Sequence, residues 1–138
     1  MRNKTKFLVA LVLISLCVAP LFARNFSFGP ARSFEKPPEP RLVCPINDVV
    51  ALSGDTLLFK WWHADIGIDR YEFNLYKGSQ MFSDGLMLHK ILPFSQSSIK
   101  IDAGLFENGR VYTWSLRQVT DSGLKSDKSF ITFSVLKE

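Results

Sequence analysis

The sequence is poor in the residues that build metal sites and catalytic centres. It contains two histidines and two cysteines in 138 residues. His63 and His89 are not accompanied by a cluster of Cys, His or Asp at metal-ligand spacing, which argues against a zinc site. A glycine-rich phosphate loop before a helix and a serine in a nucleophile elbow are also missing. We therefore expect a non-enzymatic protein that binds no metal and no cofactor.

Carboxylate pairs suited to acid/base chemistry are also scarce. Asp65 and Asp69 are the nearest approach to such a pair, and they flank a turn signal that contains Gly67. Aspartate is favoured at turns because its side chain hydrogen-bonds to the local backbone. A structural role for both residues is therefore preferred over general acid/base catalysis.

Long apolar runs are missing apart from one near the N-terminus. This run, residues 7–19, is about 13 residues long, whereas a membrane-spanning helix needs roughly 20. Three basic residues precede it, and residues 20–23 follow it and end in alanine. This order is typical of a secretory signal peptide. We expect residues 1–23 to be cleaved, so that no stable membrane span remains and the product is exported, either periplasmic or secreted. A retained anchor is the alternative.

An excess of charge of one sign is missing once the signal peptide is removed. Lys+Arg then falls from 17 to 14 against 13 Asp+Glu, so the net charge changes from +4 to +1. The basic residues that remain do not cluster along the sequence. We therefore expect no nucleic-acid partner, which would require a concentrated basic surface.

The remaining cysteine cannot form an internal disulfide. Cys17 leaves with the signal peptide, and Cys44 is then alone. A free exposed thiol is unfavourable in an oxidising compartment. Cys44 is therefore interpreted as a small apolar residue of the core or of a sheet edge, and pairing with another chain is the alternative.

Residues 24–41 are predicted to be a Pro-rich extended linker. The segment 35–40 mixes prolines with charged residues and cannot build a core. Phe26, Phe28 and Phe34 are unusual for a linker and could dock on the domain or on a partner, although a disordered terminus is the alternative.

Beyond residue 41, apolar residues alternate with polar ones in the period of a β-strand. The clearest examples are Phe59-x-Trp61, Tyr71-x-Phe73-x-Leu75 and Tyr112-x-Trp114-x-Leu116. Glycine-containing turn signals separate the runs, and no helical pattern competes with them. Seven strands are predicted, near residues 42–51, 56–62, 69–77, 86–91, 97–103, 110–119 and 128–136.

Residues 42–138 resemble a fibronectin type III domain, one of the immunoglobulin-like folds, and more narrowly the variety found in bacterial exported proteins. The resemblance is carried by Phe-x-Trp, Tyr-x-Phe-x-Leu, Asn-Gly-x-x-Tyr-x-Trp-x-Leu and a final Phe-x-Val strand. It implies an all-β, antiparallel Greek-key β-sandwich of seven strands, three in one sheet and four in the other. It also implies that Tyr112 forms a corner hydrogen bond. Such domains usually serve as adhesion modules, spacers or receptor fragments.

The alternation also divides the strands into inward and outward faces. Leu57, Phe59, Trp61 and the three residues of each Tyr-containing run are predicted to point inward. Leu58, Lys60, Thr113 and Ser115 are predicted to be exposed. Exposed aromatic and Arg side chains dominate binding interfaces, so outward and loop residues of these types are the candidate partner-binding residues. These residues are Trp62, Tyr76, Arg117, Phe82 and Phe94, and Phe130 is a further outward aromatic.

Together these patterns predict an exported, non-enzymatic binding or adhesion module. Its partner would be a protein or glycan at the cell envelope, contacted by one face and the loops of the sandwich. The alternative is a structural subunit of an envelope assembly, in which the chain self-associates through strand or edge pairing.

Overall fold

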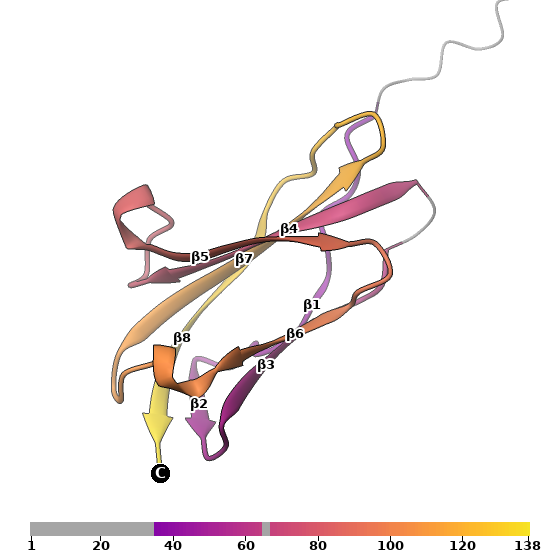
Figure 1. Cartoon of the computed structure of the whole chain (residues 1–138). Helices are drawn as coiled ribbons and strands as arrows, with labels where there is room; N and C mark the ends of the chain where they lie inside the picture. The colour runs from indigo at the N-terminus through magenta and orange to yellow at the C-terminus, as the bar shows by residue number, and fades with distance from the viewer. Residues whose placement is uncertain (1–34, 65–66) are drawn as a thin grey trace, which may run out of the picture. The chain divides into compact units, whose positions relative to one another are not determined.

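The computed structural model describes residues 35–64 and 67–138, and the regular secondary structure of this part of the chain is almost entirely β-strand (Figure 1). Two single-turn 3-10 helices lie in the connections. The elements, in chain order, are β1 (Leu42–Cys44), β2 (Val49–Leu52), β3 (Thr56–Trp61), β4 (Ile68–Lys77), η1 (Ser83–Gly85), β5 (Leu86–Pro93), β6 (Ser98–Asp102), η2 (Ala103–Leu105), β7 (Val111–Thr120) and β8 (Ser129–Lys137).

The strands form two sheets. One sheet has three antiparallel strands in the order β1-β3-β6, and the other has five strands in the order β2-β8-β7-β4-β5. All neighbours in the larger sheet are antiparallel except β2, which runs parallel to β8. The predicted all-β fold with two sheets is therefore confirmed.

The strand count differs from the prediction at the start of the domain. The run expected as one broken strand over residues 42–51 is two strands, β1 and β2, which belong to different sheets. Pro45 separates them, and a proline has no backbone N–H to donate to a sheet. The chain therefore leaves the smaller sheet at this point and joins the larger one, which has five strands instead of four.

Aromatic rings from both sheets fill the space between them. Phe59 of β3 is fully buried, and its ring centroid lies 5.3 Å from that of Phe73 and 5.2 Å from that of Trp114. Both contacts are edge-on, the geometry that aromatic pairs prefer. The predicted inward face is confirmed for Trp61 of β3 as well as for the inward runs of β4 and β7. The largest buried side chains are Trp61, Trp114, Tyr71, Tyr112, Phe59, Phe73, Phe106 and Phe133.

Two buried side chains in this core hydrogen-bond to the backbone. The Nε1 of Trp114 donates to the carbonyl oxygen of Pro45 at 3.0 Å, which ties β7 to the segment between β1 and β2. The hydroxyl of Tyr112 accepts a hydrogen bond from the backbone N–H of Glu107 at 2.7 Å. This second bond confirms the corner interaction expected of Tyr112.

The outer face of the larger sheet is less exposed than predicted. Thr113 and Ser115 of β7 were expected to be exposed, but only 1% and 0% of their surfaces are accessible. Their strand lies between β4 and β8, so neighbouring side chains flank them on both sides. The Oγ1 of Thr113 donates to the carbonyl oxygen of Gly78 at 2.9 Å, which satisfies a polar group that is out of water.

The described part of the predicted linker, residues 35–41, lies against the sandwich. Pro37 and Pro40 are buried. The Nε2 of Gln118 donates to the carbonyl oxygen of Pro38 at 2.7 Å, and the Oγ of Ser129 donates to that of Pro40 at 2.5 Å. These bonds connect the segment to β7 and β8. The signal peptide, the three linker phenylalanines and Cys17 lie outside the described residues.

Candidate functional site

The five predicted partner-binding residues do not form one surface. Trp62 and Phe82 are strongly exposed, with 62% and 65% of their surfaces accessible. Phe94 is half-buried. Tyr76 and Arg117 are on the larger sheet, where Tyr76 is buried and Arg117 forms an ion pair with Glu72.

Tyr76 and Arg117 need separate corrections. Tyr76 was expected to be exposed, but only 5% of its surface is accessible, because it lies on β4 between β5 and β7. The Nε of Arg117 lies 3.1 Å from Oε2 of Glu72, and the Nζ of Lys125 lies 2.8 Å from Oε1 of the same carboxylate. Arg117 is therefore engaged inside its own sheet.

The Glu72 carboxylate is held ionised by these two cations. Its burial alone would raise its pKa, but the hydrogen bond and positive charge of Lys125 and the charge of Arg117 outweigh this, so that the pKa of Glu72 is lowered. Asn74 continues the polar row, with its Oδ1 2.6 Å from Nδ1 of His89. Although the Nε of Arg117 makes no hydrogen bond, the charges of Glu72, Arg117 and Lys125 offset one another within the fold, as in a structural network.

Trp62 is the predicted residue with the strongest local support for a binding role. It follows the last residue of β3, and its backbone N–H donates to the carbonyl oxygen of Arg41 at 2.8 Å. The guanidinium carbon of Arg41 lies 5.9 Å from the centroid of the Trp62 ring, within the range of a cation–π contact. The exposed indole is therefore positioned by Arg41, which directly precedes β1, the strand paired with β3.

Trp62 lines two shallow hollows. One has a volume of about 230 Å³ and is lined by Val43, Lys60 and Ser97 together with Trp62. The other has a volume of about 200 Å³ and is lined mainly by the polar and proline residues of segment 38–41. The indole therefore takes part in the lining of two depressions, each of which also has polar residues in its lining.

His63 extends this aromatic region to Phe94. The centroid of the His63 ring lies 4.5 Å from that of Phe94, which comes from the connection between β5 and β6. Trp62 and Phe94 were predicted separately. In the structure they are connected by His63, which follows Trp62 in the chain and packs against Phe94. His63 was not among the predicted binding residues, because its contact with Phe94 joins two distant parts of the sequence.

The outer face of the smaller sheet continues from Trp62 and is basic. Because side chains alternate along a strand, Leu58, Lys60 and Trp62 share the outer side of β3. Lys60 is paired with Ser98 of β6, and Leu58 is paired with Lys100. We call this surface the Trp62 face, and its residues are Arg41, Val43, Leu58, Lys60, Trp62, Ser98 and Lys100.

The basic character of the Trp62 face was missed in the sequence. Arg41, Lys60 and Lys100 are separated by 19 and 40 positions, so they form no cluster along the chain. They meet because β6 pairs with β3 in one particular register. The alternation of Lys60 with Trp62 was the signal available, but it could not identify the residues on the neighbouring strands.

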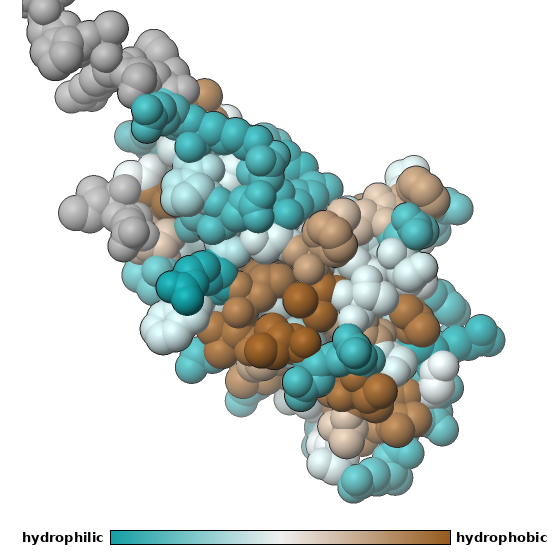
Figure 2. All heavy atoms as spheres, turned by 180° about the vertical axis from the view of Figure 1, so that it is seen from behind, coloured by the Kyte–Doolittle hydropathy of each residue, from teal (hydrophilic) through white to brown (hydrophobic). Residues whose placement is uncertain are grey.

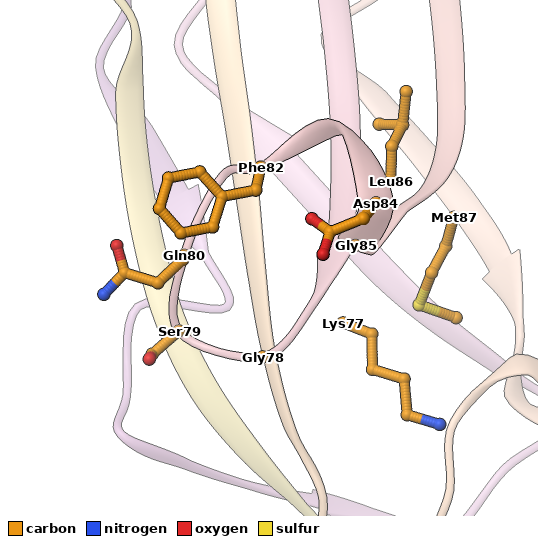
Figure 3. A pocket seen from close by; sticks show the side chains of 9 residues that line it. All are labelled: Lys77, Gly78, Ser79, Gln80, Phe82, Asp84, Gly85, Leu86 and Met87. Carbon is orange, nitrogen blue, oxygen red and sulfur yellow. The ribbon is translucent and has the colours of Figure 1, made fainter.

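A larger hollow lies elsewhere, in the connection between β4 and β5. Its volume is about 560 Å³, and it is lined by residues 77–80, 82 and 84–87. Figure 3 shows that its side chains diverge: Phe82 and Gln80 point to one side, whereas Lys77 and Met87 point to the other. The Nζ of Lys77 also lies 3.1 Å from a carboxylate oxygen of Glu107. This hollow is enclosed by a curved loop, and its polar side chains do not converge on a common point where a ligand could bind.

A second exposed surface is apolar and lies beside β1 and β8. Ile46 and Phe130 expose 53% and 55% of their surfaces and line a hollow with Leu42 and Ile131. Figure 2 shows an apolar area at the centre of the molecule seen from behind, with hydrophilic side chains beside it. Phe130 is thus exposed, as predicted. Exposed apolar groups that gather in this way often mark an interface.

Cys44 lies on β1, at the edge of the smaller sheet, and is half-buried. Its Sγ lies 3.7 Å from the carbonyl oxygen of Leu58. This placement agrees with the interpretation of Cys44 as a small residue of a sheet edge.

Within the described residues, no three His, Cys, Asp or Glu side chains lie close enough together to hold a metal ion. None of the helices in the same part of the chain has the length and apolar character needed to cross a bilayer.

No known protein family matches this sequence, and no curated protein is similar enough to count as a match. The assignment of function therefore depends on the geometry of the surfaces described above.

Proposed function

We propose that this protein is an exported, non-enzymatic binding module of the fibronectin type III-like kind, which contacts a protein or glycan through the Trp62 face. The observation that carries the proposal is the exposure of Trp62, at 62%, together with its fixed position beside Arg41. A rigid, exposed indole can supply a large contact area at a small cost in conformational entropy. Aromatic and Arg side chains supply most of the energy of typical interfaces.

The assignment of the fold to this family is supported by two features. Tyr112 forms the corner hydrogen bond that the resemblance implies, and the core is built from the inward aromatic residues of both sheets. Greek-key connectivity and a role outside the cytoplasm remain part of the proposal.

The binding proposal is tested with a glycan array and with immobilised cell-envelope proteins. The wild-type chain is compared with Trp62→Ala and with Phe82→Ala, which removes an equally exposed aromatic ring from a different loop. We expect binding to be lost with Trp62→Ala and kept with Phe82→Ala. Binding that persists in Trp62→Ala would remove the site from this face.

A second candidate function is that of a structural subunit in an envelope assembly. It is favoured by the hollow beside β1 and β8, where the apolar side chains of Ile46 and Phe130 are exposed. Native mass spectrometry over a concentration series tests it. Stable self-association that is lost in Phe130→Ser favours the subunit, whereas a monomer at every concentration favours the binding module.

A further inference from the structure

We infer that the Trp62 face binds an acidic polysaccharide, with Trp62 stacking on a sugar ring and Arg41, Lys60 and Lys100 contacting its anionic groups. This inference rests on the proposed binding function and names the chemical class of the ligand. Four observations carry it: the spacing of the cations, their lack of internal partners, the single exposed indole and the small apolar area around it.

The three cations form a strip across the smaller sheet. Lys60 on β3 lies opposite Ser98, and Lys100 is two residues farther along β6, so the two lysines are diagonal neighbours. Diagonal neighbours on one face have Cα atoms about 7–8 Å apart. Arg41 extends the strip beyond Lys60, at the side of the sheet where β1 lies. A linear ligand lying across the strands would therefore meet one positive charge after another.

These cations lack counter-ions within the described residues. Ion pairs there engage other basic side chains, namely Lys36, Arg70, Lys77, Arg110, Arg117 and Lys125. Arg41, Lys60 and Lys100 are in none of these pairs. The nearest acidic residue on the same side of β6 is Asp102, whose Oδ1 already accepts a hydrogen bond from the backbone N–H of Gly104 at 2.6 Å. Among the described residues, Glu39 is the one acidic residue that lines the hollows beside Trp62. The exposed charges of Arg41, Lys60 and Lys100 are therefore available to an anionic ligand.

The pattern of apolar groups favours a sugar over a protein or a membrane. Apart from Trp62, the large exposed apolar residue on this face is Leu58, which is 39% exposed. A protein interface usually buries a continuous apolar centre, and a membrane-bound surface inserts several apolar side chains. A single indole that lines two shallow hollows fits the flat apolar face of a sugar ring, and the polar residues of these hollows can meet hydroxyl groups.

The inference is tested by calorimetric titration of the exported chain with three polymers. Polygalacturonate supplies carboxylates, dextran sulfate supplies sulfates, and unmodified dextran is neutral. The key variant is Lys60→Ala/Lys100→Ala. Its control, Lys128→Ala/Lys137→Ala, removes the same charge from the end and the approach of β8 on the other sheet. A Trp62→Ala variant measures the stacking contribution, and circular dichroism checks that each variant is folded.

We expect at least one acidic polymer to bind and dextran not to bind. The Lys60/Lys100 variant should weaken binding about tenfold or more, because charge-assisted contacts are lost, and the control variant should change affinity by less than about threefold. Trp62→Ala should also weaken it. A preference for polygalacturonate or for dextran sulfate would identify the anionic group, and either preference supports the inference.

Other outcomes overturn the inference in distinguishable ways. Dextran binding that depends on Trp62 but not on the lysines would leave the binding function standing and exclude an acidic ligand. Equal losses in the two lysine variants would show that only net charge matters. Binding to phosphatidylserine vesicles or to poly-glutamate, without binding to the acidic polysaccharides, would replace the sugar by a membrane or a protein. If none of these probes binds and the array and envelope experiments are also negative, the proposed function fails together with the inference.

Discussion

Trp61 and Trp114 offer a direct test of how buried polar groups contribute to the stability of this domain. Both indoles are almost fully buried, with exposed fractions of 1% and 0%. They differ in their hydrogen bonds. The Nε1 of Trp114 donates to Pro45, whereas the Nε1 of Trp61 has no acceptor among the described residues. Replacing each tryptophan by phenylalanine removes the same atoms from both sites. The change leaves the acceptor of Trp114 without its donor, whereas at Trp61 it removes a donor that has no acceptor.

The magnitudes follow from these two environments. Shrinking a core side chain by this amount costs about 1–2 kcal/mol at either site. Trp114→Phe additionally leaves the buried carbonyl oxygen of Pro45 without its donor, which costs about 1–3 kcal/mol. Trp61→Phe instead removes an unsatisfied donor and regains part of a similar penalty. We therefore expect Trp114→Phe to be more destabilising than Trp61→Phe by at least about 1 kcal/mol.

The measurement is urea unfolding followed by far-ultraviolet circular dichroism, because tryptophan fluorescence would itself change between the variants. With a slope of about 1–3 kcal/mol per molar urea, a gap of about 1 kcal/mol separates the midpoints by roughly 0.3–1 M. Trp62→Phe is the control, and its exposed site should change stability by no more than about 0.5 kcal/mol. The reasoning is refuted if Trp61→Phe proves as destabilising as Trp114→Phe.

Three further predictions concern the corner, the buried carboxylate and processing. Tyr112→Phe removes the acceptor of the Glu107 N–H and should lower the free energy of unfolding by about 1–3 kcal/mol in the same titration. The pKa of Glu72 is lowered from its ordinary value of 4.5, so its stabilising effect is complete above that pH and is lost as the pH falls through the lowered value. Unfolding measured at a series of acidic pH values should therefore show a steeper loss of stability than in Glu72→Gln, and equal slopes would contradict this. Intact mass of the exported protein should correspond to a chain that begins at Arg24, and a product that keeps residues 1–23 in the membrane fraction would show that the signal is retained.

Most of the strands could be predicted from the sequence because a half-buried strand imposes a period of two on its side chains. The third predicted strand, 69–77, corresponds to Ile68–Lys77, and the sixth, 110–119, corresponds to Val111–Thr120. The inward positions of Trp61 and Trp114 follow from the same period. These successes depend only on each strand by itself.

The predictions of burial and of contacts between strands that were wrong or missing depend on which strands are neighbours in a sheet. Thr113 was expected to be exposed because polar residues alternate with the core residues of its strand, but strands on both sides cover it. Tyr76 is buried for the same reason. The meeting of Lys60 with Lys100 required the register between β3 and β6, which no local pattern specifies. The sequence therefore predicts the faces of single strands better than the surfaces that several strands build together.

The parallel pairing of β2 with β8 has a mechanical consequence for a domain pulled at its two ends. Val49 to Leu52 lie opposite Ser134 to Lys137 in a continuous ladder, with β2 close to the start of the domain and β8 at its end. Because the two strands run in the same direction, tension between the ends slides one lengthwise past the other and strains the bonds of the whole ladder together. Antiparallel strands pulled at adjacent ends instead separate one bond at a time. The β2–β8 ladder is therefore loaded in shear when the ends are pulled apart, and its rupture would set the rate at which the domain unfolds under force.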